Sequence, residues 1–100
     1  MMGGGGMNMK ALQDMQKKLA KAEEDLKERI VEGSAGGAVK VGVNGTQEIV
    51  YFKIDESALA DKSMLEDMLA AAANQALEKS KKMRETEMQK VTGLAMPGLM

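Results

Sequence analysis

Apolar residues recur at alternating intervals of three and four between residues 12 and 26, and this spacing predicts an amphipathic helix. The helix begins near Met9, and neither glycine nor proline interrupts the chain before Gly33, which allows roughly 22 helical residues. So narrow an apolar stripe is typical of a helix that packs against one or two partner helices. The stripe consists of Leu12, Met15, Leu19, Ala22 and Leu26.

The spacing then changes to that of strands. A first strand starts at Ile30 and ends near the glycine pair at 36–37, which indicates a tight reversal. In residues 39–43 valine alternates with lysine and glycine, which is the two-residue period of a second strand. Asn44 and Gly45 follow, and this dipeptide predicts a hairpin because both residue types tolerate positive φ.

The third strand is expected from Glu48 to Ile54, and it is apolar at almost every position. A strand with one face in water should alternate between apolar and polar residues. Because this one does not, we expect both of its faces to be covered. The chain's own helices would cover one face, and a second subunit could cover the other.

A second long helix is predicted from Met64 to about Val91, after a short helical turn at 57–60. Ser63 and Glu66 match the capping-box spacing, in which each side chain bonds a free amide at the helix start. The alanine run at 70–73 favours helix and allows close approach of another backbone. The apolar positions are Leu65, Met68, Leu69, Ala72, Ala76 and Met83.

These elements predict an α+β domain with the order α-β-β-β-α, in which a three-stranded antiparallel meander lies between two long helices. We expect a single domain over residues 9–92, with flexible termini at 1–8 and 93–100. The chain has one tyrosine, one phenylalanine and no tryptophan, so the core of one chain is thin. Small domains with thin cores often gain stability by oligomerising, and a dimer is therefore expected.

The composition argues against several classes of protein. Cysteine and histidine are both absent, which removes the commonest catalytic base and the commonest metal ligands. We therefore expect no enzymatic activity, no metal site and no cofactor. No apolar run approaches the ~20 residues needed to cross a bilayer, and residues 1–9 do not resemble a signal peptide. The expected location is the cytoplasm, without a membrane partner.

The formal net charge is only −1, but the charges are unevenly distributed. Residues 10–21 carry four lysines and one aspartate, and residues 79–90 carry five basic and two acidic side chains. The middle of the chain, residues 22–67, carries five basic and eleven acidic side chains. The basic residues of the two outer segments are Lys10, Lys17, Lys18, Lys21, Lys79, Lys81, Lys82, Arg84 and Lys90.

Chain direction joins the two basic segments. The first helix enters the sheet at its C-terminal end and the second leaves it at its N-terminal end, so helices packed side by side would run antiparallel. Both segments would then lie at one distal end, away from the acidic middle. Lysines that neutralise phosphates release counterions, which favours sequence-independent binding of a nucleic acid. The alternative is a plain solvated surface, with the helices forming a protein-binding coiled coil of a structural or adaptor protein.

The ordered set of segments resembles the YbaB/EbfC family of nucleoid-associated proteins over residues 7–100. The resemblance rests on a first helix rich in methionine, glutamine and lysine, on Val31-Glu32-Gly33-Ser34-Ala35-Gly36-Gly37, and on Val39-Lys40-Val41 running into Val43-Asn44-Gly45. Further on it includes Ile54-Asp55, Met64-Leu65-Glu66-Asp67-Met68 with the alanine run, Asn74, and Met96-Pro97-Gly98. Gly42 departs from the pattern, where a β-branched residue is usual, and so does Ala73, where a bulkier one is common.

The resemblance implies an intertwined cytoplasmic homodimer with projecting helices that binds double-stranded DNA with little sequence preference in the nucleoid. Family genes often lie beside recombination-repair and replication genes, which makes proteins of those processes candidate partners. The nine basic residues given above are the expected DNA contacts. The expected dimer interface consists of Ile49, Val50, Tyr51, Phe52, Ile54, Leu65, Met68 and Leu69.

Overall fold

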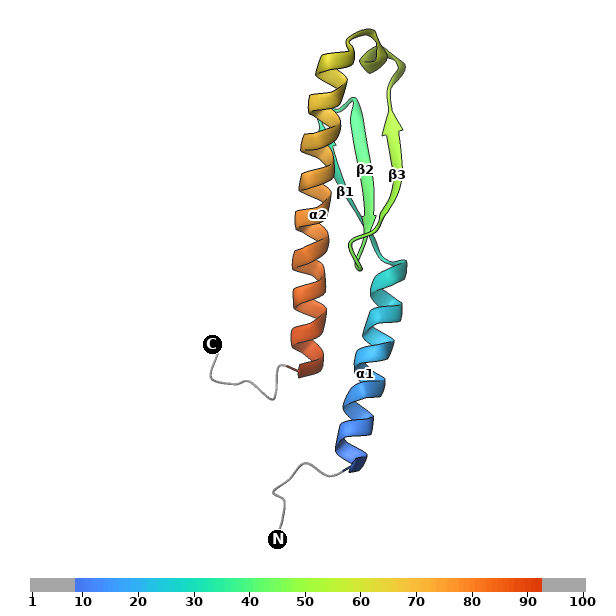
Figure 1. Cartoon of the computed structure of the whole chain (residues 1–100), viewed down its shortest axis with the longest axis vertical. Coiled ribbons are helices and arrows are strands. Elements are labelled where there is room, and N and C mark those ends of the chain that lie inside the picture. Colours follow the sequence, from blue (N-terminus) through green and yellow to red (C-terminus); the bar gives the residue numbers. More distant parts are fainter. Residues whose placement is uncertain (1–8, 93–100) are drawn as a thin grey trace.

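The computed structural model describes residues 9–92, and it confirms the expected α-β-β-β-α order (Figure 1). The flexible termini expected at 1–8 and 93–100 lie outside the described residues. No helix within the described range is long and apolar enough to cross a membrane. The elements are α1 (Met9–Glu28), β1 (Ile30–Ala35), β2 (Val39–Asn44), β3 (Ile49–Ile54), a 3₁₀ turn η1 (Glu56–Ala60) and α2 (Lys62–Thr92).

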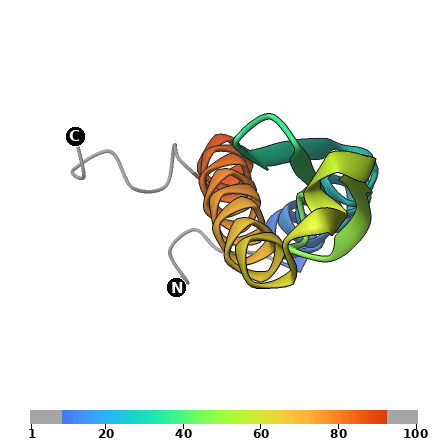
Figure 2. The same ribbon diagram turned by 90° about the horizontal axis from the view of Figure 1, so that it is seen from above.

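The three strands form an antiparallel sheet in the order β1-β2-β3, and α2 packs along β1 and β2 (Figures 1 and 2). The alternation predicted for β2 is confirmed, because its three valines are fully buried and face α2. They form the centre of the core together with two alanines of the helix. These core residues are Val39, Val41, Val43, Ala72 and Ala76.

Small residues allow α2 to lie directly on β1. A Cβ atom added at Gly33 would lie 2.1 Å from the carbonyl oxygen of Ala72 and 2.6 Å from the amide nitrogen of Ala76. Both of those atoms belong to the helix backbone, which cannot move aside as a flexible side chain can. The glycine in β1 and the alanines in α2 therefore act together: because all of them are small, the helix can pack closely against the strand.

The expectation that both faces of β3 are covered is wrong for the chain on its own. In the antiparallel register Tyr51 lies opposite Gly42, and Lys53 lies opposite Lys40, on the face that points away from α2. The Tyr51 hydroxyl donates a hydrogen bond to the Glu32 carboxylate at 2.5 Å, and this bond is the main cause that lowers the pKa of Glu32 below its ordinary value. This face of the sheet is polar.

The same register explains Gly42, the departure from the family pattern. A Cβ atom at Gly42 would lie 2.3 Å from two ring carbons of Tyr51, so the ring occupies the space that a β-branched side chain would need. A register irregularity between Gly42 and Val43 accompanies this arrangement. Packing is therefore maintained by a glycine–aromatic pair across the two strands.

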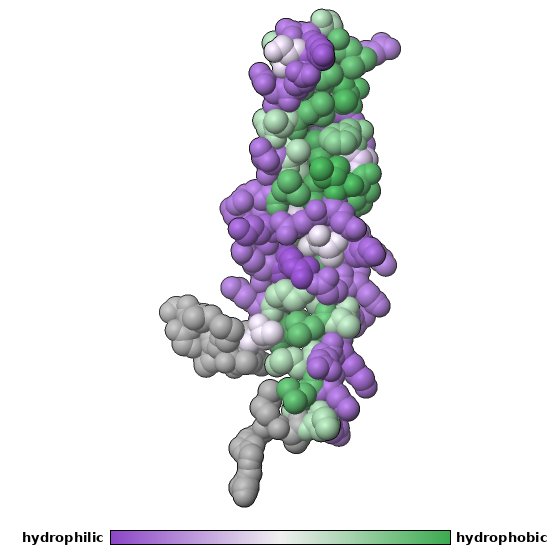
Figure 3. Space-filling view, in the orientation of Figure 1, coloured by the Kyte–Doolittle hydropathy of each residue, from purple (hydrophilic) through white to green (hydrophobic). Residues whose placement is uncertain are grey.

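The other side of β3 is apolar and largely exposed, because α2 packs mainly on β1 and β2. Phe52 lies opposite Val41 and shares its face of the sheet, yet it is 53% exposed. Figure 3 shows apolar colour gathered over the upper half of the molecule, where α2 and β3 lie. The exposed large apolar residues of these elements are Ile49, Val50, Phe52 and Ile54 in β3, Leu59 in η1 and Met64 in α2.

The start of α2 differs from the prediction. The helix begins at Lys62, and the Met64 amide donates to the Asp61 carboxylate at 3.0 Å. Asp61 is therefore the N-cap residue, three residues before the bonded amide. Ser63 lies inside the first turn of the helix, and the capping box predicted for Ser63 and Glu66 is wrong.

Candidate nucleic-acid interface

Beyond the sheet, the molecule continues as two helices side by side. We call β1, β2, β3, η1 and residues 62–77 of α2 the sheet half, and α1 with residues 78–92 of α2 the arm half. The two helices of the arm half run antiparallel, as chain direction predicts, and the N-terminal end of α1 extends past the end of α2 (Figure 1). The basic residues named from the sequence all belong to the arm half by this division, and Lys79 among them also contacts β1.

The loop between β2 and β3 packs against the C-terminal end of α1 and so connects this helix to the sheet half. The Gly45 amide donates to the carbonyl oxygens of Leu26, at 2.8 Å, and of Arg29, at 3.0 Å. These bonds satisfy carbonyls that a helix end would otherwise leave free. Leu26 is fully buried, and a Cβ atom at Gly45 would lie 2.7 Å from its carbonyl oxygen. Gly45 is needed here for close approach; the positive φ of this loop is at Gln47 instead, at 65°.

Asn44 and Ser80 hold the same loop against α2. The Ser80 hydroxyl donates to the Asn44 carbonyl oxygen at 2.5 Å, and both residues are buried. The Asn44 side chain accepts from the amides of Thr46 and Glu48, each at 3.0 Å, and so shapes the turn. We call this contact region of Leu26, Asn44, Gly45 and Ser80 the joint, because it fixes where α1 lies relative to α2.

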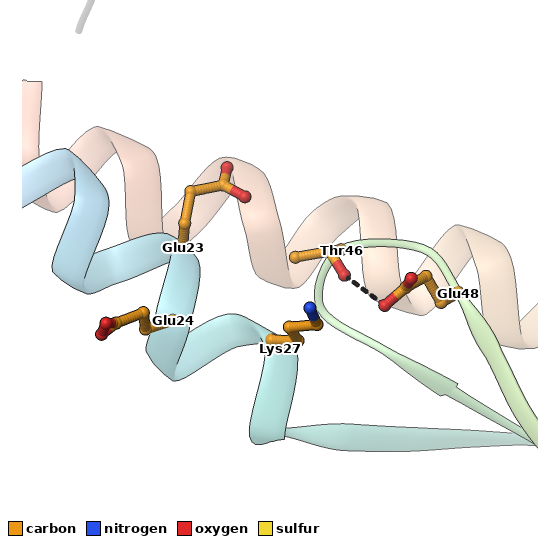
Figure 4. Close-up of a pocket in the computed structure, with 5 residues that line it drawn as sticks. All are labelled: Glu23, Glu24, Lys27, Thr46 and Glu48. Atoms are coloured by element: carbon orange, nitrogen blue, oxygen red, sulfur yellow. Dashed lines mark hydrogen bonds between the residues drawn. The ribbon is translucent and has the colours of Figure 1, made fainter.

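One side of the joint is a depression of about 360 Å³ lined by Glu23, Glu24, Lys27, Thr46 and Glu48 (Figure 4). Figure 4 shows Glu24 pointing away from the hairpin and the Thr46 hydroxyl bonded to Glu48. Hydrogen bonds from Asn44 and Thr46 lower the pKa of Glu48 below its ordinary value. Three carboxylates and one ammonium line this depression, so its net negative charge repels phosphate. Within residues 9–92, no group of acidic side chains is arranged to hold a metal ion.

The structure brings three of the nine predicted DNA contacts together. Lys18 and Lys21 of α1 and Lys90 of α2 line a shared depression of about 330 Å³ in the arm half. Asp25 and Glu87 line it as well. The two basic segments therefore meet only where the end of α2 lies beside the middle of α1, and this overlap is shorter than the sequence suggested.

The other predicted contacts lie on either side of this overlap. Lys10 is in the first turn of α1, beyond the end of α2 (Figure 1). Lys79 lies next to the sheet, where its ammonium donates to the Glu32 carbonyl oxygen at 2.8 Å. Six of the nine predicted contacts are exposed lysines with neither a salt bridge nor the backbone hydrogen bond of Lys79 within residues 9–92: Lys10, Lys17, Lys18, Lys21, Lys81 and Lys82.

Two predicted contacts are held by carboxylates. Arg84 of α2 pairs with Glu23 of α1, and Lys90 lies 3.3 Å from Glu87. Glu87 also accepts from Arg29, at 2.6 Å, and the hydrogen bond from Arg29 is the largest cause that lowers the pKa of Glu87 below its ordinary value. Arg84 was expected to face solvent as part of the basic segment. The structure shows it half-buried between the two helices instead.

Sequence reasoning missed Ser80 because it stands within a run of lysines. Its position nevertheless continues the buried stripe of Ala72 and Ala76 at intervals of four residues, which is one face of a helix. Following that face past the last apolar residue would have indicated burial of Ser80. Its hydroxyl then needs a partner, which Asn44 provides.

The fold and the arm half define a class of small proteins in which two antiparallel helices extend from a three-stranded sheet and carry lysines away from an acidic body. The YbaB/EbfC DNA-binding family model matches residues 2–95, and the chain therefore belongs to that family. A protein of Moorella thermoacetica named "Nucleoid-associated protein" is 50% identical, with 97% of this chain and 99% of that protein covered.

A second sequence relative and one solved structure are also similar to this chain. A protein of Pelotomaculum thermopropionicum with the same name is 47% identical, with 96% of this chain and 97% of that protein covered. A crystal structure of an uncharacterized Helicobacter pylori protein matches with a TM-score of 0.72 and 31% identity, covering 81% of this chain and 92% of that one.

Proposed function

We propose that this protein binds double-stranded DNA in the nucleoid as a homodimer, with little sequence preference, through the lysines of the arm half. The observation that carries the proposal is that six of the nine predicted contacts, given above, are exposed lysines of the arm half with neither a salt bridge nor a backbone hydrogen bond in the described structure. Ammonium groups free of carboxylates are available to phosphates, and each phosphate contact releases counterions. The names of the relatives from Moorella and Pelotomaculum support the nucleoid as the location.

The experiment is a gel shift with unrelated duplexes at low and moderate salt. Replacing Lys18 and Lys21 with glutamate should lower the affinity by about tenfold or more, because two phosphate contacts become repulsive. The matched control replaces Lys40 and Lys62 of the sheet half, which changes the net charge equally. Equal losses in both variants would contradict the arm half as the binding surface.

Salt separates this function from the adaptor alternative. Binding through lysines requires the affinity to fall steeply as salt rises, with a slope that reports the number of phosphates neutralised. Absence of any shift at low salt, in protein that keeps its helices, would contradict DNA binding and favour a protein-binding role for the two helices.

We further propose that the apolar surface of the sheet half is where two chains associate. It contains four of the predicted interface residues, Ile49, Val50, Phe52 and Ile54, all exposed in the single chain. Leu65, Met68 and Leu69 are half-buried and pack against the core, whereas Tyr51 lies on the polar face. Exposed apolar patches of this kind mark association sites.

A substitution on the strand tests the dimer. Phe52→Asp should shift the protein toward the monomer at micromolar concentration in analytical ultracentrifugation, because it places a charge within the apolar surface. Lys40→Asp on the opposite face is the control and should leave the mass unchanged. A dimer of wild-type strength in the Phe52 variant would contradict this interface.

A further inference from the structure

Both arginines of this chain are bound by glutamates, and this pattern distinguishes them from the lysines. The sequence contains two arginines, Arg29 and Arg84. Arg29 bonds Glu87 at 2.6 Å, and Arg84 pairs with Glu23. Each bridge connects α2 with α1 or with the residue that follows α1.

We infer that Glu23 and Glu87 limit sequence readout by withholding both guanidinium groups from the bases, an inference that rests on the proposed DNA binding. The chemistry of the two cations gives the reason. Arginine presents a planar fork that bonds guanine through two atoms, which is the commonest base-specific contact. Lysine acts as a point charge and suits phosphates, which carry no sequence information.

The positions of the bridges support this role. Glu87 lines the same depression as Lys18, Lys21 and Lys90, so the guanidinium that it binds lies beside the proposed phosphate contacts. Arg84 follows Lys81 by three residues in α2, and residues three apart are neighbours on a helix surface. Arginines released from these carboxylates would therefore lie among the lysines that hold the duplex.

The exposure of the bridges makes release feasible. The side chains of Arg29 and Glu87 are 50% and 23% exposed, and those of Arg84 and Glu23 are 36% and 45% exposed. Solvent-exposed ion pairs add little to stability. Replacing the glutamates should therefore free the arginines without unfolding the domain.

The experiment measures the affinity of the full chain, by fluorescence anisotropy, for a G·C-rich and an A·T-rich duplex of equal length. The test variant combines Glu23→Gln with Glu87→Gln. The matched control combines Glu24→Gln with Glu85→Gln, which removes the same charge from neighbouring glutamates that form no salt bridge in the described structure. The control should raise both affinities equally. The test variant should also change the ratio of the two affinities by at least about fivefold in favour of the G·C-rich duplex.

Arginine-to-lysine variants complete the test. Adding Arg29→Lys and Arg84→Lys to the test variant should abolish the gained preference while keeping the charge. The same two substitutions in the wild-type background should change affinity by less than twofold, since the withheld arginines do not contact DNA.

The results that would overturn this inference differ from the result that would overturn the proposed function. An unchanged affinity ratio in the test variant, a loss of affinity for both duplexes that the control does not show, or a loss above fivefold in the wild-type background with lysines would each overturn the inference. Failure of the wild-type protein to bind either duplex would instead overturn the proposed function, and the inference with it.

Discussion

The sheet half and the arm half are stabilised in different ways. In the sheet half, three valines, two alanines and Gly33 form a dry contact in which the helix backbone lies against a strand. In the arm half, the fully buried side chains Leu26 and Ser80 both belong to the joint, and ion pairs connect the helices further out. Apolar burial contributes far more to stability than exposed ion pairs. The sheet half therefore contributes most of the stability of the fold, whereas the outer part of the arm half is held mainly by exposed ion pairs.

The largest effect is expected where the sheet half is packed most closely. Gly33→Ala should destabilise the protein by about 3 kcal/mol or more, because the new methyl group meets the backbone of α2. Chemical denaturation followed by circular dichroism measures the loss. Gly37→Asn is the control: nothing lies within 4 Å of a Cβ there, and asparagine tolerates the positive φ of 70°. Equal stability of the Gly33 variant and the wild type would contradict the close contact.

A smaller, local effect is expected at the joint. Gly45→Ala should cost about 1–3 kcal/mol, because a Cβ there meets both the carbonyl and the side chain of Leu26. Amide hydrogen exchange should rise throughout α1, while the amides of β2 keep their protection. Faster exchange in both halves alike would show that the joint belongs to the core, and the proposed division of the molecule would then be wrong.

The smallest effect is expected from pH. Hydrogen bonds from Arg29 and Lys90 hold the pKa of Glu87 below its ordinary value of 4.5, so its carboxylate form favours the folded state. That contribution is complete above pH 4.5 and is lost as the pH falls through the lowered pKa. Glu87→Gln should therefore lower the thermal midpoint more at pH 7 than at pH 3. Glu85→Gln is the control, and an equal effect of both variants at pH 7 would contradict the bridge.

The order and approximate limits of the elements could be predicted from the sequence, because each has a strong period. The valine alternation of β2 and the stripe of α1 each depend on local spacing alone. The cap of α2 was predicted wrongly because Asp61 and Ser63 both have side chains suited to capping. Which of them caps depends on where η1 ends, and that is a tertiary property.

The candidate site was less predictable. Charge order along the chain placed the lysines on one half of the molecule, since chain direction fixes which ends meet. It did not indicate that Arg84 meets Glu23, because that contact depends on how the two helices are rotated about their axes. Nor did it show that Tyr51 turns away from the apolar surface, because the face of each residue of β3 follows from the register with β2.

The joint also sets the rotational phase of α1. Leu26 is fully buried beneath Gly45, which fixes the rotation of α1 about its axis. The direction of every earlier side chain then depends on how many residues separate it from Leu26. One residue inserted before Leu26 would turn the lysines of α1 by about 100° around the helix axis, since an α-helix has 3.6 residues per turn. Composition and charge would hardly change, yet Lys18 and Lys21 would no longer face Lys90. In α1, the number of residues between the lysines and the joint is thus as much a part of the proposed binding surface as the lysines themselves.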